Sequence, residues 1–205
     1  MVFICTVQRR VEALGATRSS VSAVSFEKVV FLADIEKLEL LSSVVVSVET
    51  SVPLLLYAGS GCDVVFPLEY VRLLFPAIKS LSCVFVDVIP QQGLIETVLD
   101  DLGISFARDG NVLMFWWGDI LVRLRIVTCD VFSFIDTFSG FDIYFERAFR
   151  IMKDGQDKYE AEVATRLNTG GVVISDSGFL GVGLDYVIVD PTLSVYGEMV
   201  VGKKK

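Results

Sequence analysis

The sequence predicts an α/β protein with a mostly parallel twisted sheet, helices on both of its faces and an antiparallel hairpin at its C-terminal end. The apolar run 54–58 ends abruptly in a Gly-Ser-Gly turn at 59–61, and a second apolar run, 83–88, carries the acid Asp87 near its end. Short continuous apolar runs are typical of parallel strands buried on both faces. A strand, a glycine turn, a helix and a strand ending on an acid form the unit with which open α/β sheets bind nucleoside-containing cofactors.

The remaining elements follow from local patterns. A helix is expected at 67–75, with Pro67 in its first turn, where a missing N–H is tolerated. Helical spacing predicts a second helix at 91–102, closed by Gly103. Turn signals at Asp109-Gly110 and Gly118-Asp119 predict antiparallel pairing around them. The other predicted elements are strands at 112–117, 120–128, 141–145 and 172–175, a helix at 157–167, and a hairpin of 186–189 and 196–201 about Pro191.

One domain with an extension is expected. A chain of 205 residues is long enough for one full hydrophobic core. Residues 51–205 are predicted to form a Rossmann-like domain with an antiparallel β-meander inserted near 104–128, and residues 1–50 an N-terminal extension that is partly helical and packs on the core. Adjacent residues of a strand point to opposite faces, so one of Trp116 and Trp117 is expected in the core and the other at an edge or interface.

The composition favours a protein of the reducing cytoplasm without a membrane span. Hydrophobic residues make up 53% of the chain and the mean hydropathy is +0.60. Charged residues such as Glu49, Asp63 and Asp119 nevertheless interrupt the apolar stretches before the roughly 20 residues that a span needs. Residues 1–17 are interrupted too early for a signal peptide. The four cysteines stand singly and are expected to act as small buried apolar residues.

The absence of histidine limits the chemistry. Without histidine or a C-x-x-C pair, a conventional zinc site is disfavoured, and we expect no metal. The usual general base and any Ser–His or Cys–His nucleophile are also missing. A net charge of −8 disfavours nucleic acid as a partner and favours a small-molecule or protein partner. The apolar excess favours a homo-oligomer.

With the glycine turn, Asp87 and this order of elements, the chain resembles the class I S-adenosylmethionine-dependent methyltransferase superfamily over roughly 53–202. The resemblance implies S-adenosylmethionine as cofactor, with the glycine turn against its amino-acid and ribose part. It further implies that Asp87 holds the ribose hydroxyls, that Asp130 bonds the adenine amino group, and that the C-terminal hairpin inserts an antiparallel strand into the sheet. The cofactor-binding residues implied in this way are Gly59, Ser60, Gly61, Asp63, Asp87, Asp130 and Val131.

The acceptor half of the site departs from the family pattern. In amino-methylating members the fourth strand ends in a proline–aromatic motif, whereas here it ends Tyr144-Phe145-Glu146-Arg147. Glu146 is the candidate catalytic residue, as a general base whose pKa burial would raise. The alternative is a Glu146–Arg147 pair on a solvated helix. Asp87 and Asp130 likewise have an alternative role as caps of a helix or turn.

These features favour a methyltransferase that uses S-adenosylmethionine and has an unidentified acceptor. Methyl transfer is an in-line displacement that depends on near-attack geometry, so it tolerates the absence of histidine. One alternative is a catalytically degenerate Rossmann-like binding or assembly protein, in which side chains would block the glycine turn. Another is a nicotinamide-dependent oxidoreductase, which a third glycine would favour, but Val64-Val65-Phe66 stands where that glycine would lie.

Overall fold

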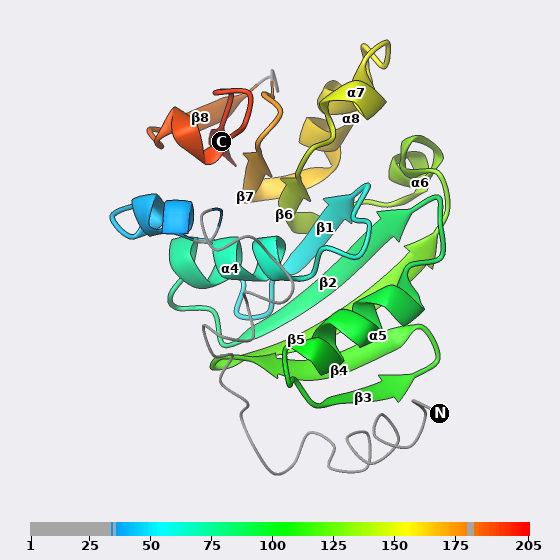
Figure 1. Ribbon diagram of the computed structural model, residues 1–205. Helices are drawn as coiled ribbons and strands as arrows, with labels where there is room; N and C mark the ends of the chain where they lie inside the picture. The colour runs from blue at the N-terminus through cyan, green and yellow to red at the C-terminus, as the bar shows by residue number, and fades with distance from the viewer. Residues whose placement is uncertain (1–33, 35, 180–182) are drawn as a thin grey trace.

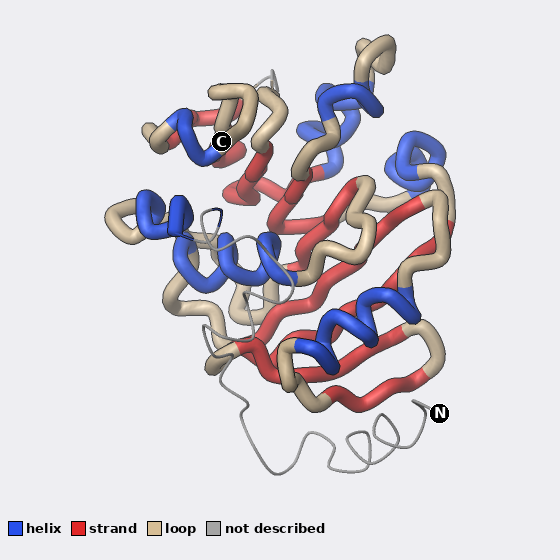
Figure 2. Tube along the Cα trace, in the orientation of Figure 1, coloured by secondary structure: helices blue, strands red, loops and turns tan. Residues whose placement is uncertain are grey.

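The computed structural model describes residue 34 and the ranges 36–179 and 183–205. These residues form a nine-stranded sheet in the order β3-β4-β5-β2-β1-β6-β7-β9-β8 (Figures 1 and 2). The strands are β1 (Leu54–Ala58), β2 (Ser80–Asp87), β3 (Phe106–Asp109), β4 (Val112–Trp117), β5 (Ile120–Thr128), β6 (Phe141–Glu146), β7 (Leu167–Ser175), β8 (Leu184–Val187) and β9 (Val200–Lys204).

The centre of the sheet is parallel and its two ends are antiparallel. Strand β1 pairs in parallel with β2 on one side and β6 on the other, and β5 and β7 extend this parallel core. Strands β3 and β4 join β5 as an antiparallel meander. Strand β9 lies antiparallel between β7 and β8. The predicted fold class is therefore confirmed, including the C-terminal hairpin that inserts an antiparallel strand.

Helices cover both faces of this sheet. On one face lie α4 (Val65–Leu74), α5 (Gln92–Asp101) and the 3₁₀ helix η1 (Lys37–Leu41), whose buried side chains pack with alternate residues of the core strands. On the other face lie α6 (Val131–Thr137) and α8 (Tyr159–Arg166). Short helices α7 (Arg150–Lys153) and η2 (Pro191–Leu193) complete the described elements. None of the described helices is long and apolar enough to cross a membrane.

Strand β1 shows how the sequence fixes this layering. Leu55 and Tyr57 point to the α4–α5 side, whereas Leu56 and Ala58 point to the α6–α8 side, and all four are buried. Alternate side chains of a strand face opposite sides, so a strand covered on both sides must be apolar throughout. The predicted strand 54–58 has the same bounds in the structure. Strand β1 consequently carries no charged side chain.

Several predicted boundaries were wrong, and β2 for example begins at Ser80, three residues before the predicted 83. Helix α4 begins two residues before the predicted 67–75. Strand β7 begins at Leu167, directly after α8, and not after a glycine break at 172. Gly170 and Gly171 lie within this strand, where Gly170 takes φ +73° and a Cβ on Gly171 would lie 2.8 Å from the Asn168 carbonyl oxygen. These glycines serve an irregular strand start, since the β6–β7 register shifts there.

The C-terminal hairpin, the N-terminal extension and the cysteines only partly match their predictions. The C-terminal hairpin pairs 184–187 with 200–204, a few residues from its predicted segments, and η2 lies in its connection. The helical part expected within the N-terminal extension 1–50 is represented by Asp34, Glu36 and η1, and residues 1–33 and 35 of the extension lie outside the described residues. Cys83 is buried as expected, but Cys62 is exposed and Cys129 is partly exposed.

Trp117 joins the meander to the core helix α4. Its side chain is 1% exposed, and its indole N–H donates to Glu69 Oε1 at 2.7 Å, while Trp116 is only half-buried. Glu69 is itself buried and also accepts from Arg72. The expectation that one tryptophan lies in the core is confirmed.

We expect Trp117→Phe to lower the free energy of unfolding by about 2–3 kcal/mol. The substitution removes a hydrogen bond to a buried charged group and leaves a small cavity. Trp116→Phe, one residue away, is the matched control and should cost less. Urea denaturation of both variants checks this, and equal losses would contradict the role given to Trp117.

Candidate functional site

A cleft of about 300 Å³ opens at the carboxyl ends of β1, β2, β5 and β6. This edge is where ligands bind in open α/β sheets, beside the point where the strand order reverses. Among the described residues that line it, none is a lysine or arginine, and the polar side chains include two carboxylates and one amide. The lining residues are Gly59, Val86, Asp87, Val88, Ile89, Gln91, Cys129, Asp130, Val131, Phe132, Ala148, Phe149 and Met152.

The glycine turn that follows β1 is held against the end of β2. Gly59 and Gly61 have φ values of +61° and +51°, which glycine adopts without strain. The buried Ser60 donates its N–H to the Val86 carbonyl at 3.2 Å. The Gly61 N–H donates to Asp87 Oδ2 at 2.8 Å. Ser60 and Gly61 therefore shape the turn, and of the three residues Gly59 alone lines the cleft.

Asp87 lies on the cleft wall with spare hydrogen-bonding capacity. Besides the bond from Gly61, its Oδ1 accepts from the Ile89 N–H at 2.9 Å. A carboxylate offers about four lone-pair positions, so roughly two remain for a ligand. Both observed bonds come from backbone groups and fix the carboxylate's orientation. The geometry is compatible with the ribose-binding role that the resemblance implied.

Asp130 serves as the N-cap of α6. Its carboxylate accepts from the N–H groups of Phe132 and Ser133, and from the Ser133 hydroxyl at 2.9 Å. The sequence analysis offered a turn cap as the alternative for Asp130, and the structure shows that it caps a helix. Asp130 and Val131 also line the cleft, so a second role toward a ligand stays a prediction.

Asp63, in contrast, is turned away from the cleft. Its Oδ1 accepts from the Phe66 N–H at the start of α4, and its Oδ2 accepts from the Tyr57 hydroxyl, both at 3.1 Å. Burial raises the pKa of Asp63, and the Arg147 guanidinium, 3.9 Å away, opposes this shift. The structure therefore brings together Gly59, Asp87, Asp130 and Val131 but places Asp63 in a separate structural contact.

Phe149 lines the cleft, although no sequence pattern singled it out. An ideal Cβ on Gly59 would lie 2.6 Å from two ring carbons of Phe149, far inside normal contact. The space left by the missing Gly59 side chain is therefore filled by the protein's own ring. Phe132 and Tyr159 pack beside the same ring, with centroids 5.9 and 6.0 Å away. The sequence signal was an aromatic residue shortly after a core strand, which is too common to stand out.

The backbone beside Phe149 is strained. Ala148 has φ +55°, a conformation that no other non-glycine residue among those described adopts. Its N–H donates to Asp176 Oδ1 at 2.8 Å, and the Phe149 N–H donates to Ser177 Oγ at 3.2 Å. Strained backbone of this kind persists where surrounding contacts determine it, and it concentrates at functional sites. Contacts from the end of β7 thus hold Phe149 over the glycine turn.

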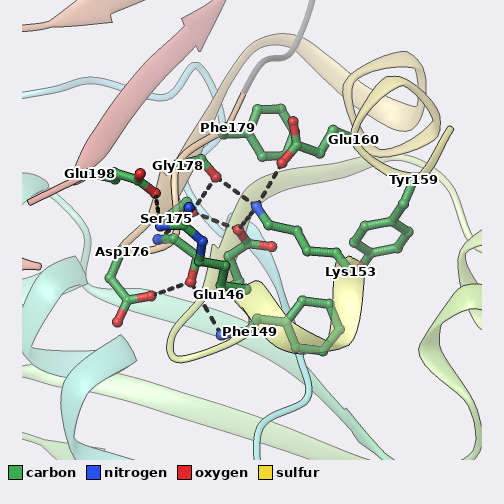
Figure 3. Close-up of polar contacts among 12 residues, drawn as sticks. Glu146, Phe149, Lys153, Tyr159, Glu160, Ser175, Asp176, Gly178, Phe179 and Glu198 are labelled. Carbon is green, nitrogen blue, oxygen red and sulfur yellow. Dashed lines mark hydrogen bonds and ion pairs between the residues drawn. The ribbon is translucent and has the colours of Figure 1, made fainter. Parts of the chain in front are cut away.

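Glu146 belongs to a network of polar contacts that joins the ends of β6 and β7 to α7 (Figure 3). It is 1% exposed, its Oε1 accepts from Lys153 at 2.5 Å and Ser175 at 2.6 Å, and its Oε2 accepts from the Tyr144 hydroxyl at 2.7 Å. Lys153 also donates to Glu160 and to the Gly178 carbonyl. The alternative of a Glu146–Arg147 pair on a solvated helix is wrong, because Glu146 is buried and pairs with Lys153.

Burial raises the pKa of Glu146, as expected, and the ion pair with Lys153 opposes that shift. Glu146 does not line the cleft, however, but a separate cavity of about 30 Å³. With both oxygens occupied by donors from the protein, the carboxylate anchors α7 to the ends of β6 and β7. Its catalytic role stays a prediction that this geometry does not favour.

No protein-family model matches the sequence, and no curated protein matches it. Similar solved structures include MNMC2 from Aquifex aeolicus, at 15% identity and TM-score 0.46, over 85% of this chain and 58% of that one. A precorrin-6y C5,15-methyltransferase from Geobacter metallireducens matches at 16% identity and TM-score 0.37, over 69% of this chain and 59% of that one. PKMT2 from Rickettsia typhi in complex with AdoHcy matches at 13% identity and TM-score 0.41, over 69% of this chain and 24% of that one. This chain thus spans less than two thirds of each of these proteins.

One of these similar structures, the precorrin-6y protein, is a methyltransferase by title. Because their TM-scores lie below 0.5, the fold assignment rests on the strand order itself. That order has a parallel core with antiparallel β9 inserted between β7 and β8, as the resemblance to class I methyltransferases implied. The chain therefore has a Rossmann-like fold of the methyltransferase type.

We expect Gly59→Ala to destabilise the protein by about 2–4 kcal/mol, from backbone strain and overpacking against Phe149. In a Phe149→Ala background the same change should cost about 1–2 kcal/mol, because only the backbone strain remains. Gly61→Ala is the matched control, since nothing lies within 4 Å of its Cβ position and its cost should not depend on Phe149. Denaturant unfolding of this double-mutant cycle checks the contact, and additive losses at Gly59 would contradict it.

Glu146 should also make the stability depend on pH. A raised folded-state pKa means that the folded protein holds a proton that the unfolded chain releases near its ordinary value of 4.5. The free energy of unfolding of the wild type, minus that of Glu146→Gln, should therefore fall as the pH rises from about 4.5 through the raised pKa. Urea titrations at a series of pH values measure this difference, and a flat or rising difference would be inconsistent with the buried carboxyl.

Proposed function

We propose that this protein is an S-adenosylmethionine-dependent methyltransferase and that the 300 Å³ cleft is its cofactor site. The observation that carries the proposal is a cleft at the strand ends with two carboxylates, Asp87 and Asp130, between apolar walls and no cationic residue among its described lining. This arrangement suits a nucleoside with hydroxyl and amino donors and with a positive charge, as S-adenosylmethionine has at its sulfonium. It disfavours ligands whose phosphates would need a cation.

The resemblance assigns roles that the geometry allows. Asp87, oriented by the backbone at Gly61 and Ile89, would accept from the ribose hydroxyls. Asp130 would accept from the adenine amino group in addition to capping α6. S-adenosylmethionine supplies an electrophilic methyl group when it is bound, and the chain's residues would orient it toward the acceptor and exclude water.

The acceptor is proposed to be a small molecule or a protein. Nucleic acid suits the site less well, since the cleft has no lysine or arginine in its described lining and the chain's net charge is −8. The acceptor would approach beside the loop after β6, where Ala148, Phe149 and Met152 border the cleft.

A nicotinamide-dependent oxidoreductase is a poorer fit. In dinucleotide-binding folds the pyrophosphate lies at the N-terminus of the helix after the first strand. In this protein that helix is α4, and the Asp63 carboxylate already accepts from its Phe66 N–H. A second negative group at the same helix end would be repelled by this carboxylate.

A cofactor-free binding or assembly module is the second candidate, and one specific observation favours it. The ring of Phe149 fills the space beside Gly59 that a ligand's amino-acid part would need. In such a module the glycine would be required for internal packing and not for ligand approach. Ligand binding decides between the two candidates.

We expect calorimetric titration with S-adenosylhomocysteine to give binding to the wild type that weakens roughly 10- to 100-fold in Asp87→Ala, because hydrogen bonds to a charged group are lost. Asp101→Ala, which removes an exposed carboxylate at the far end of α5, is the matched control and should bind normally. Thermal unfolding verifies that Asp87→Ala is folded. If neither the wild type nor Phe149→Ala gives a heat of binding, the methyltransferase proposal is rejected and the assembly module is favoured.

A further inference from the structure

Gln91 lies between β2 and α5 and lines the cleft. Its side chain is 7% exposed, and its Oε1 is fully buried without a hydrogen-bond partner in the described part of the chain. A buried acceptor without a donor loses its bonds to water and gains nothing in return. Because Gln91 lines the cleft, a small change in its side chain would let a ligand there supply the donor.

The protein's neighbouring side chains do not provide that donor. The other polar side chains of the cleft include the carboxylates of Asp87 and Asp130, which accept hydrogen bonds when ionised but do not donate them. Pro90, directly before Gln91, has no N–H. The β2–β5 side of the cleft thus presents three side chains with acceptor oxygens.

The side-chain amide of the adjacent Gln92, in contrast, finds hydrogen-bond partners within the protein. Its Nε2 donates to Glu96 Oε1 and to the Gly110 carbonyl, both at 3.1 Å. Gln92 does not line the cleft. Of these two consecutive glutamines, Gln91 is the one that lines the cleft, and its buried Oε1 has no partner among the described residues.

We propose that Gln91 is a ligand-binding residue whose Oε1 accepts a hydrogen bond from a hydroxyl or amino group of a nucleoside in the cleft. The inference rests on the proposed function, because it takes the cleft to be the site of an adenosine-containing ligand. The exocyclic amino group of adenosine has two N–H hydrogens, so it can donate to Gln91 as well as to Asp130 while the ribose hydroxyls donate to Asp87. The amide also discriminates against a ligand that lacks a donor at this point, since the oxygen would then stay unpaired.

The test compares Gln91→Met with Gln92→Met, using adenosine and S-adenosylhomocysteine as probes. Methionine has nearly the same length and shape as glutamine but no acceptor oxygen. Gln91→Met should raise the thermal unfolding temperature of the ligand-free protein, because an unsatisfied polar atom is removed, and weaken binding of both probes by about 3- to 10-fold. Gln92→Met should lower the unfolding temperature and leave binding unchanged. A residue with a merely structural role would not shift stability and affinity in opposite directions.

The outcomes separate the two proposals. If the wild type binds the probes and Gln91→Met binds them equally well, the role of Gln91 is overturned and the cofactor site stands. If Gln91→Met destabilises the ligand-free protein, its oxygen has a partner within the fold and the inference is overturned by that measurement alone. If the wild type and Phe149→Ala bind neither probe, the proposed function fails and the role of Gln91 fails with it.

Discussion

Burial of the central strands on both faces is the constraint from which the rest of this structure follows. Strands β1, β2, β6 and β7 lie between two layers of helices, so their side chains must be apolar wherever they are covered. Polar groups are then displaced to the strand ends, where backbone and side-chain donors meet. Asp87 and Glu146 both stand at such ends, on strands that flank β1. The candidate site and the anchoring network are therefore two consequences of one packing rule.

These two polar groups are used in opposite ways. Asp87 keeps unused lone pairs in an open cleft, whereas Glu146 is saturated by donors from Lys153, Ser175 and Tyr144. The segment that follows Glu146 carries Ala148 and Phe149. It is held by Asp176, which accepts from the Ala148 N–H, and by Lys153, which pairs with Glu146. A satisfied buried network of this kind rigidifies its surroundings, and loss of Lys153 would leave the Glu146 carboxylate without its cation. It can hold a strained residue at the edge of the cleft.

The sequence predicted the parts of the fold and site that depend on local patterns. The strand 54–58, the Gly-Ser-Gly turn and Asp87 are contiguous or nearly so, and apolar runs and glycines report directly on burial and positive φ. The roles of Asp63 and Asp130 were harder to predict, because an acid just before a helix can cap that helix or contact a ligand. The positions of Phe149 and Lys153 depend on contacts between distant segments. Such contacts leave no periodicity in the sequence that could reveal them.

The two halves of the cleft place different demands on a ligand. On the β2–β5 side, Asp87, Asp130 and Gln91 offer acceptor oxygens, and the buried oxygen of Gln91 lacks a donor in the described residues. On the β1–β6 side, the Phe149 ring already fills the space that Gly59 leaves. Under the proposed function, an amino-acid tail against the turn would require Phe149 to move, whereas the acceptor oxygens on the β2–β5 side are independent of that ring. Affinity for the nucleoside part alone should consequently depend little on Phe149, and the energetic cost of admitting a complete cofactor is concentrated in that one ring.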